Sequence, residues 1–308
     1  MKKRVKYSSI NIRGYKLVVL IIVFFLLVLS VILLLNQKTG LTNKIAVIPI
    51  SGEIGYSDSF SGTSVDPEQI VSYIDGANKD DSIKAIILDI NSPGGTVVAS
   101  EEIANAVKKS KKPVVALINE VGASGAYWIA SSSDKIVASK MSITGSIGVT
   151  SSYIEFSKLM EKYGITYNSL KAGEYKDTGS PYKELTEKER KILENTLNKI
   201  YDYFIEQVSI NRNISDSKVR ELATGMIYLG DEAKALGLID EIGDKDKAIE
   251  IAKKLANIKE AKLVTYQREL TLLDVMQRFS GEVFYNIGRG IGRELFSVSE
   301  EKELKFSA

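Results

Sequence analysis

Residues 114–128, VVALINEVGASGAYW, carry an apolar run directly into a turn of small residues. The run from Val114 to Asn119 has the length and composition of a strand that is covered on both faces. Small residues on both sides of Ser124 permit a sharp strand-to-helix turn, which can present the hydroxyl beside the free amides at a helix start. The same pattern also fits a serine that only caps the helix.

Outward from this turn, short β-branched runs alternate with amphipathic stretches, which predicts an α/β fold with a largely parallel sheet flanked by helices. The expected strands are 45–50, 85–91, 114–119, 135–138 and 165–170. The expected helices are 67–77, 97–109, 124–132 and 153–163. A long amphipathic helix should begin near Thr186, where Glu189 completes a capping box, and shorter helices should follow at 216–223, 231–236 and 245–255.

A second turn, residues 91–95 with the sequence NSPGG, also joins an expected strand to an expected helix. Consecutive glycines let backbone N–H groups face outward, as an oxyanion hole or a phosphate-binding turn requires. A Pro-Gly-Gly sequence is also common in turns without any such role. Because both turns should leave the carboxyl edge of one parallel sheet, where α/β proteins place their sites, their coincidence favours a functional role.

The chain contains no histidine and no cysteine. Ser/His/Asp triads, Cys/His dyads, two-His zinc helices and disulfides are therefore excluded. For a serine nucleophile the best remaining base is a lysine held neutral by burial. Lys176 is the candidate, because it lies in a glycine-containing loop between an expected strand and the long helix. Its neighbour Asp177 should point away from the amine, since a carboxylate facing it would favour the protonated form.

Residues 17–35 form an apolar run interrupted only by Ser30, long enough to cross a hydrocarbon core of roughly 30 Å. The preceding residues 1–16 carry a charge of +6. The positive-inside rule then predicts a single-pass cell-membrane protein with a cytoplasmic N-terminus and an extracytoplasmic catalytic domain. A cleaved signal peptide is the alternative, but the run exceeds a usual h-region and residues 36–43 offer no small-x-small cleavage site.

Charge also bears on partners. The whole chain is +2, so the part after residue 16 is −4, which predicts neither a nucleic-acid interface nor a basic membrane-binding face on the folded part. The expected organisation is a cytoplasmic basic segment 1–16, a transmembrane helix 17–35, a catalytic domain 44–258 and a C-terminal extension 259–308 without an assigned fold.

Four segments, in this order, resemble the signal peptide peptidase A family of membrane proteases, whose fold is similar to Clp protease and the crotonases. They are residues 91–95 (NSPGG), 122–128 (GASGAYW), 144–149 (TGSIGV) and 175–181 (YKDTGSP). Their spacing matches the short, single-repeat form, and the likeness spans about residues 44–253. The tail after about Lys262 lies outside the resemblance.

The resemblance implies roles for individual residues. Ser124 would attack the peptide carbonyl as nucleophile, and Lys176 would take its proton as general base. The amides of Gly95 and Gly125 would hold the oxyanion. Ser146 would hydrogen-bond and orient the lysine amine, a role that composition and spacing do not assign.

The resemblance further implies a serine endopeptidase that needs no metal or cofactor, acts on apolar peptides such as cleaved signal peptides, and forms a homo-oligomer. Ala126 and Trp128 stand where the family commonly has Gly and Tyr, which changes the pocket wall but removes no catalytic group. Two alternatives use the same fold. One is a crotonase-like acyl-CoA enzyme, which an external domain on a membrane anchor disfavours, and the other is an inactive membrane scaffold.

Overall fold

The structure is a computed structural model that describes residues 19–31, 43–56, 64–267 and 289. The chain divides into two compact units, 1–266 and 267–308, and of the second only residues 267 and 289 are described. Residues 19–31 are helical and exposed. Within the described ranges no helix has both the length and the apolar character that crossing a membrane requires. The rest of the predicted span 17–35, and the basic segment 1–16, lie outside the described residues.

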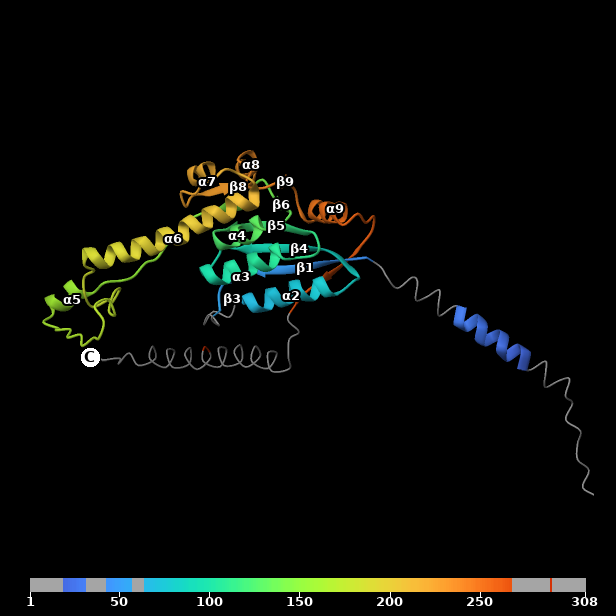
Figure 1. Cartoon of the computed structure of the whole chain (residues 1–308), viewed down its shortest axis with the longest axis horizontal. Coiled ribbons are helices and arrows are strands. Elements are labelled where there is room, and N and C mark those ends of the chain that lie inside the picture. Colours follow the sequence, from blue (N-terminus) through green and yellow to red (C-terminus); the bar gives the residue numbers. More distant parts are fainter. Residues whose placement is uncertain (1–18, 32–42, 57–63, 268–288, 290–308) are drawn as a thin grey trace, which may run out of the picture. The chain divides into compact units, whose positions relative to one another are not determined.

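A twisted sheet organises the first unit, with the strand order β10-β1-β4-β5-β6-β9 and with β7 and β8 continuing beside the end of β5 (Figure 1). All neighbouring pairs are parallel except β7 and β8. The strands are β1 (Lys44–Ser51), β4 (Ile83–Ser92), β5 (Val114–Ala123), β6 (Lys135–Ala138), β7 (Ile143–Gly145), β8 (Ile227–Leu229), β9 (Glu241–Ile242) and β10 (Lys262–Thr265). A second small sheet pairs β2 (Glu53–Ile54) with β3 (Ser64–Val65).

The central strands are buried on both faces because helices cover the sheet on each side. Alternate residues such as Ala46 and Ile48 join the cluster that contains α2 (Pro67–Lys79), α3 (Val97–Lys108) and α4 (Gly125–Ser131). Their neighbours on the other face pack against α9 (Lys245–Leu255). This two-sided burial explains why the strands are almost continuously apolar. The predicted α/β class and largely parallel sheet are confirmed.

The strand predictions at 45–50, 85–91, 114–119 and 135–138 are confirmed. The strand predicted at 165–170 is wrong, since the chain there has no regular structure and is exposed, with Leu170 fully so. Its apolar pattern resembles a strand, but among the described residues no neighbouring strand pairs with it. The predicted helix 153–163 shrinks to α5 (Ser157–Lys162).

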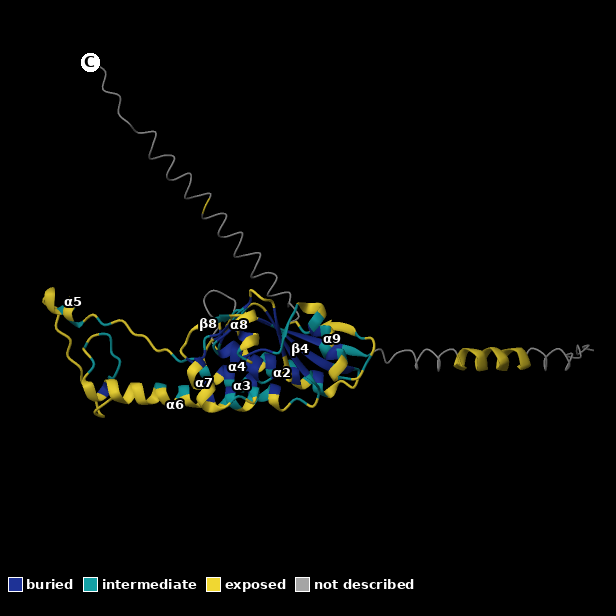
Figure 2. Cartoon of the chain, turned by 90° about the horizontal axis from the view of Figure 1, so that it is seen from above, coloured by how far each residue is buried: buried dark blue, intermediate teal, exposed yellow. Residues whose placement is uncertain are grey.

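The long helix α6 (Glu187–Arg212) begins as predicted, with a complete capping box between Thr186 and Glu189. Only the C-terminal part of its apolar stripe is buried, where Phe204 stacks on Trp128 of α4 at 5.0 Å between ring centroids. Near its start Leu193 remains 37% exposed. Figure 2 shows this part of α6, together with α5, largely exposed. The smaller helices α7 (Asp216–Leu222) and α8 (Gly230–Ala235) follow.

At the other edge of the sheet, β10 pairs with β1 in parallel register, so that Lys44 lies opposite Lys262. This strand places residues 262–265, which lie beyond the predicted end of the catalytic domain at 258, within the same sheet.

A buried hydrogen bond from Tyr127 fixes α4 to the rest of the fold. The side chain is fully buried and its hydroxyl donates to the carbonyl of Leu238 at 2.9 Å. Tyr127→Phe should lower the free energy of unfolding by about 1–3 kcal/mol, because the buried carbonyl loses its partner. Urea unfolding of the chain, followed by the fluorescence of its one tryptophan, measures this loss. Tyr153→Phe, at an exposed site, should change little.

Candidate active site

Ser124 lies where β5 ends and α4 begins, and its backbone is strained. Its φ of 54° and ψ of −125° are unusual for a non-glycine residue, a conformation that costs on the order of 1–3 kcal/mol. The amide of Ser124 donates to the carbonyl of Gly145 on β7 at 2.8 Å, which helps hold this geometry. The side chain makes no capping hydrogen bond. The hydroxyl therefore does not cap the helix, so the alternative role that the sequence allowed for this serine is excluded.

Glycines bring the second turn against Ser124. Gly94 has a φ of +106°, and a Cβ added there would lie 2.9 Å from the Cβ of Ser124. A Cβ added at Gly125 would lie 3.4 Å from the amide nitrogen of Gly95 and 2.2 Å from Ser100 Oγ. The amides of Gly95 and Gly125 thus lie close together beside the serine.

The positions of Gly95 and Gly125 in their secondary-structure elements leave both backbone amides free to donate to a ligand. Gly125 is the first residue of α4, and the first amides of a helix have no intrahelical acceptor. Gly95 forms a parallel bridge with Ile54 in which the donors are the amides of Ile54 and Thr96. Two converging N–H groups beside a hydroxyl are the arrangement that stabilises a tetrahedral oxyanion.

Ser146 joins the same site from β7. Because Ala123 pairs with Gly145, the residues that follow the two strands, Ser124 and Ser146, lie side by side. Both line a cavity of about 450 Å³, together with Gly148, Val149, Thr150, Tyr201, Ala223, Thr224 and Gly225. The Ser146 hydroxyl donates to the carbonyl of Gly225 at 3.3 Å.

A smaller cavity of about 120 Å³ adjoins Ser124, Gly95 and Gly125. Its walls are mainly apolar and include Val97, Trp128, Val149, Ile200 and Phe204. A pocket with apolar walls next to a nucleophile and two amide donors can hold an apolar side chain of a substrate. Trp128, one of the two residues that depart from the pattern of the family resemblance, is part of this wall.

Lys176 is not among the described residues that line either cavity at Ser124. It is exposed, in the segment that precedes α6. That segment is attached to the start of α6 at Glu189, whereas the cavities are lined by Ile200, Tyr201 and Phe204 further along the helix. Glu189 and Ile200 are eleven residues apart, or about 16 Å along the helix axis. One copy of the chain therefore brings four of the five predicted site residues together and leaves the lysine apart.

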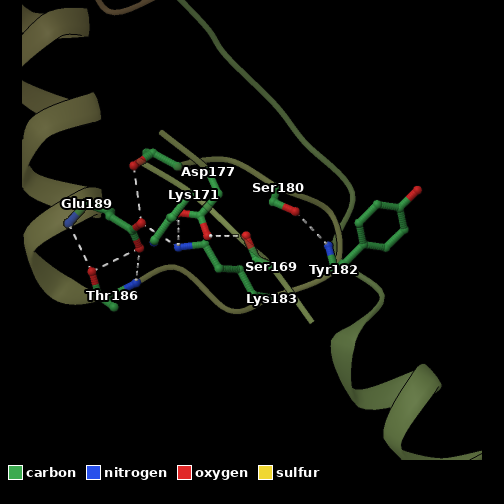
Figure 3. Close-up of polar contacts among 9 residues, drawn as sticks. Ser169, Lys171, Asp177, Ser180, Tyr182, Lys183, Thr186 and Glu189 are labelled. Atoms are coloured by element: carbon green, nitrogen blue, oxygen red, sulfur yellow. Dashed lines mark hydrogen bonds and ion pairs between the residues drawn. The ribbon is translucent and has the colours of Figure 1, made fainter. Parts of the chain in front are cut away.

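A buried carboxylate anchors the segment that carries Lys176 (Figure 3). Glu189 is only 3% exposed and is the one charged side chain buried in the described part of the chain. It accepts hydrogen bonds from Thr178 at 3.2 Å and from the Thr186 amide at 2.9 Å, and it forms an ion pair with Lys183. The ammonium of Lys183 foremost, with the Thr186 amide, lowers the pKa of Glu189 to about 2.

Asp177 continues this network on the segment that carries Lys176. Its carboxylate pairs with Lys171 at 2.6 Å and with Lys183 at 3.3 Å. The hydrogen bond from Lys171 is the main reason that the pKa of Asp177 is lowered. The described partners of the Asp177 carboxylate are thus Lys171 and Lys183, and Lys176 is not among its ion pairs.

The sequence did not predict the roles of two residues at and near the site, Ser100 and Glu189. Ser100 is a buried residue of α3, and its side chain approaches Gly125 so closely that only glycine fits there. Glu189 was recognised as a capping residue, but not as the anchor of the Lys176 segment. The sequence held one signal for the second role, namely Lys183 six residues before Glu189, but only folding shows that the two side chains meet.

A strained serine at the carboxyl edge of a parallel sheet, beside two converging glycine amides and an apolar cavity, defines an α/β protein with a site suited to acyl transfer. The comparisons give the family. A family model for peptidase family S49 matches residues 106–259. A candidate protease of Methanocaldococcus jannaschii is 38% identical over 266 residues, covering 83% of this chain and 84% of the relative.

Other relatives agree. A candidate signal peptide peptidase SppA of Enterococcus faecium is 35% identical and covers 74% of this chain and 67% of its own. Protease 4 of Haemophilus influenzae is 36% identical over 70% of this chain and 35% of its own. The chain belongs to peptidase family S49, a family of serine-type proteases, and the predicted resemblance to signal peptide peptidase A is confirmed.

Solved structures support the fold. A variant of the 1510-N membrane-bound stomatin-specific protease, in complex with a substrate peptide, aligns with a TM-score of 0.51 at 16% identity, covering 78% of this chain and 99% of its own. At this identity the likeness concerns the architecture alone.

The contact between Gly125 and Ser100 predicts a rescue experiment. Gly125→Ala should lower kcat/KM by about 10²-fold or more if the Gly95 and Gly125 amides hold the oxyanion, because the new methyl group meets Ser100 Oγ and displaces these amides. Adding Ser100→Gly should recover part of the loss. Gly55→Ala, where a Cβ would make an ordinary contact at 3.8 Å, is the matched control. Equal rates for Gly125→Ala and wild type would contradict the amide assignment.

The anchoring contacts of Glu189 predict that the stability of the Lys176 segment depends on pH. The pKa of this carboxyl is lowered from 4.5 to about 2, so its stabilising contribution is complete above pH 4.5 and is lost as the pH falls toward 2. Relative to its cutting of an unstructured reference peptide at the same pH, pepsin should cut within residues 169–186 about threefold or more faster across this window. Glu189→Gln should be cut rapidly already at pH 4.5, whereas Glu187→Gln should behave as wild type. Mass spectrometry of the fragments measures both.

Proposed function

We propose that the chain is a membrane-anchored serine endopeptidase that uses Ser124 and Lys176 as a dyad and degrades membrane-associated apolar peptides, such as cleaved signal peptides. The observation that carries this proposal is the position of Ser124. Its hydroxyl makes no helix-capping hydrogen bond. It lies near two converging glycine amides and beside an apolar cavity.

The chemistry follows from these groups. Ser124 Oγ would attack the peptide carbonyl carbon while the neutral amine of Lys176 takes the hydroxyl proton. The amides of Gly95 and Gly125 would stabilise the oxyanion of the tetrahedral intermediate. The protonated lysine would then give its proton to the leaving amine. A water activated by the same lysine would hydrolyse the acyl-enzyme and restore Ser124.

We propose that the lysine reaches Ser124 from a neighbouring copy of the chain. Within one copy, the Lys176 segment is attached to the start of α6 at Glu189. Ser124 instead shares a cavity with Ile200 and Phe204, in the C-terminal half of the same helix. The anchored segment projects from a helix that is largely exposed there, so a second copy can receive it (Figure 2). Ser146, which lines the cavity with Ser124, would hold the arriving amine.

Exposed apolar side chains support such an assembly. They gather on the same part of the chain that carries the lysine, on and around α5 and the start of α6: Ile154, Leu159, Tyr163, Ile165, Leu170 and Ile192. Monomeric soluble proteins rarely expose so many large apolar side chains together, whereas subunit interfaces bury them. A homo-oligomer that covers these side chains and completes each site from two copies accounts for both features.

The anchor and the substrate class rest on further arguments. The apolar run 17–35 and the basic residues before it favour a single span with the catalytic domain on the extracytoplasmic side. Tethering raises the local concentration of membrane-associated substrates. The apolar walls formed by Val97, Trp128 and Phe204 suit apolar side chains next to the scissile bond.

A complementation experiment tests the dyad and its division between copies. Ser124→Ala and Lys176→Ala should each lower the cleavage of an apolar reporter peptide by at least about 10³-fold. When the two variants are co-expressed in equal amounts, about one quarter of the wild-type activity should return, because random mixing pairs an intact serine with a neighbouring intact lysine that often.

The outcomes separate the alternatives. No recovery on mixing would place the lysine and the serine of each site in the same copy. Full activity of either single variant would reject the dyad. A wild-type chain that cleaves no peptide would favour the inactive scaffold, and turnover of acyl-CoA thioesters instead would favour the crotonase-like enzyme. Lys191→Ala, on the exposed side of α6, is the control and should stay within a few fold of wild type.

A further inference from the structure

Lysines gather at the edge of the sheet where the parallel strands begin. The register fixes this edge, because Lys44 at the start of β1 lies opposite both Ile83 on β4 and Lys262 on β10. Lys84 follows Ile83 on β4. Since the strands are parallel, the start of every one of them points to the same side of the domain.

The connecting turns add further lysines to this edge. Lys79 ends α2, Lys109 caps the C-terminus of α3, and Lys111 lies in the turn from α3 to β5. The turns are joined to one another, since the Asn78 side chain accepts from the Lys111 amide at 3.0 Å and from the Ser110 hydroxyl at 3.1 Å. These lysines therefore belong to one surface, which we call the basic edge: Lys44, Lys79, Lys84, Lys109, Lys111 and Lys262.

The side chains of the basic edge form no ion pair with any described residue, in contrast to many lysines elsewhere in the domain. The carboxylates at the same edge are fewer, and some of them serve the backbone. Asp80 accepts from the Ser82 amide at 2.8 Å, and Asp134 accepts from the Val114 amide at 2.7 Å. The pKa of Asp80 is lowered mainly by hydrogen bonds from Ser82 and to a lesser degree by Lys44, so this carboxylate offsets part of the lysine charge. The edge remains positive because its lysines outnumber its carboxylates.

The chain itself brings this surface to the membrane. Lys44 follows the predicted span 17–35 after only residues 36–43, eight residues that reach at most about 28 Å when fully extended. The basic edge is therefore confined near the bilayer surface, where anionic headgroups attract lysines. This step rests on the membrane anchor of the proposed function.

We propose that the basic edge binds the phosphate headgroups of anionic lipids and orients the domain on the bilayer. The carboxyl edge of the sheet, with Ser124, then faces away from the membrane. The ten residues of β4 separate the two edges by about 33 Å. A substrate must leave the bilayer before it can be cut, so the enzyme acts on released or protruding peptides and spares intact spanning helices.

Hydrogen exchange of the full chain in lipid nanodiscs tests this orientation. The discs contain phosphatidylcholine alone, or phosphatidylcholine with about 30% phosphatidylglycerol. Amides of residues 78–84, from the end of α2 to the start of β4, and of residues 109–112 should exchange at least about threefold more slowly with the anionic lipid, and raised salt should remove the difference.

Two charge-matched variants separate the edge from a general charge effect. Lys79→Gln/Lys109→Gln/Lys111→Gln should abolish the lipid-dependent protection. Lys188→Gln/Lys191→Gln/Lys199→Gln removes the same charge from the exposed face of α6 and should keep it. All of the substituted side chains are exposed, so both variants should fold, which circular dichroism checks.

Each outcome has a separate meaning. A chain that enters neither kind of disc would refute the anchor, and the orientation with it. A chain that enters both kinds with equal exchange in the turns would overturn the lipid contact and leave the anchor intact. Protection by a short DNA duplex added to neutral discs, without protection by anionic lipid, would overturn it in favour of a nucleic-acid partner.

Discussion

The architecture depends on the strained backbone of Ser124 between β5 and α4. A non-glycine residue keeps a positive φ only when its surroundings over-determine it. Here the β7 carbonyl of Gly145 binds its amide, and Gly94 packs so tightly against it that no side chain fits there. The strain turns the chain sharply from strand to helix. The hydroxyl and the amide of Gly125 consequently face one cavity, which neither a continuous strand nor a gradual turn would achieve.

A second constraint is the length of α6. One helix supports the apolar cavity through Ile200 and Phe204 and, further toward its start, anchors the lysine segment through Glu189. A rigid helix keeps these two functions apart within a single copy. In the proposed function, the exposed apolar side chains around α5 form a contact with another subunit, and the chemistry depends on that assembly.

The positive charge of the domain is unevenly distributed between the two ends of the parallel strands. The residues after position 16 are negative in sum, yet six of their lysines lie together where the strands begin. Net charge did not predict the basic edge, because a sum over the chain contains no information about which residues the parallel register brings together. The site lies at the opposite edge, so one topology separates a surface suited to a membrane from the proposed chemistry.

The sequence by itself determined the α/β class, four central strands, the start of α6 and the turn at Ser124, because these follow from local periodicity, small residues and capping. It also excluded imidazole and thiol chemistry through composition. Only the tertiary structure decided that 165–170 is not a strand, that Glu189 is buried as an anchor, and that Lys176 lies apart from Ser124. Strand pairing, burial and the distance between remote segments depend on which parts of the chain meet, and local sequence does not encode that meeting.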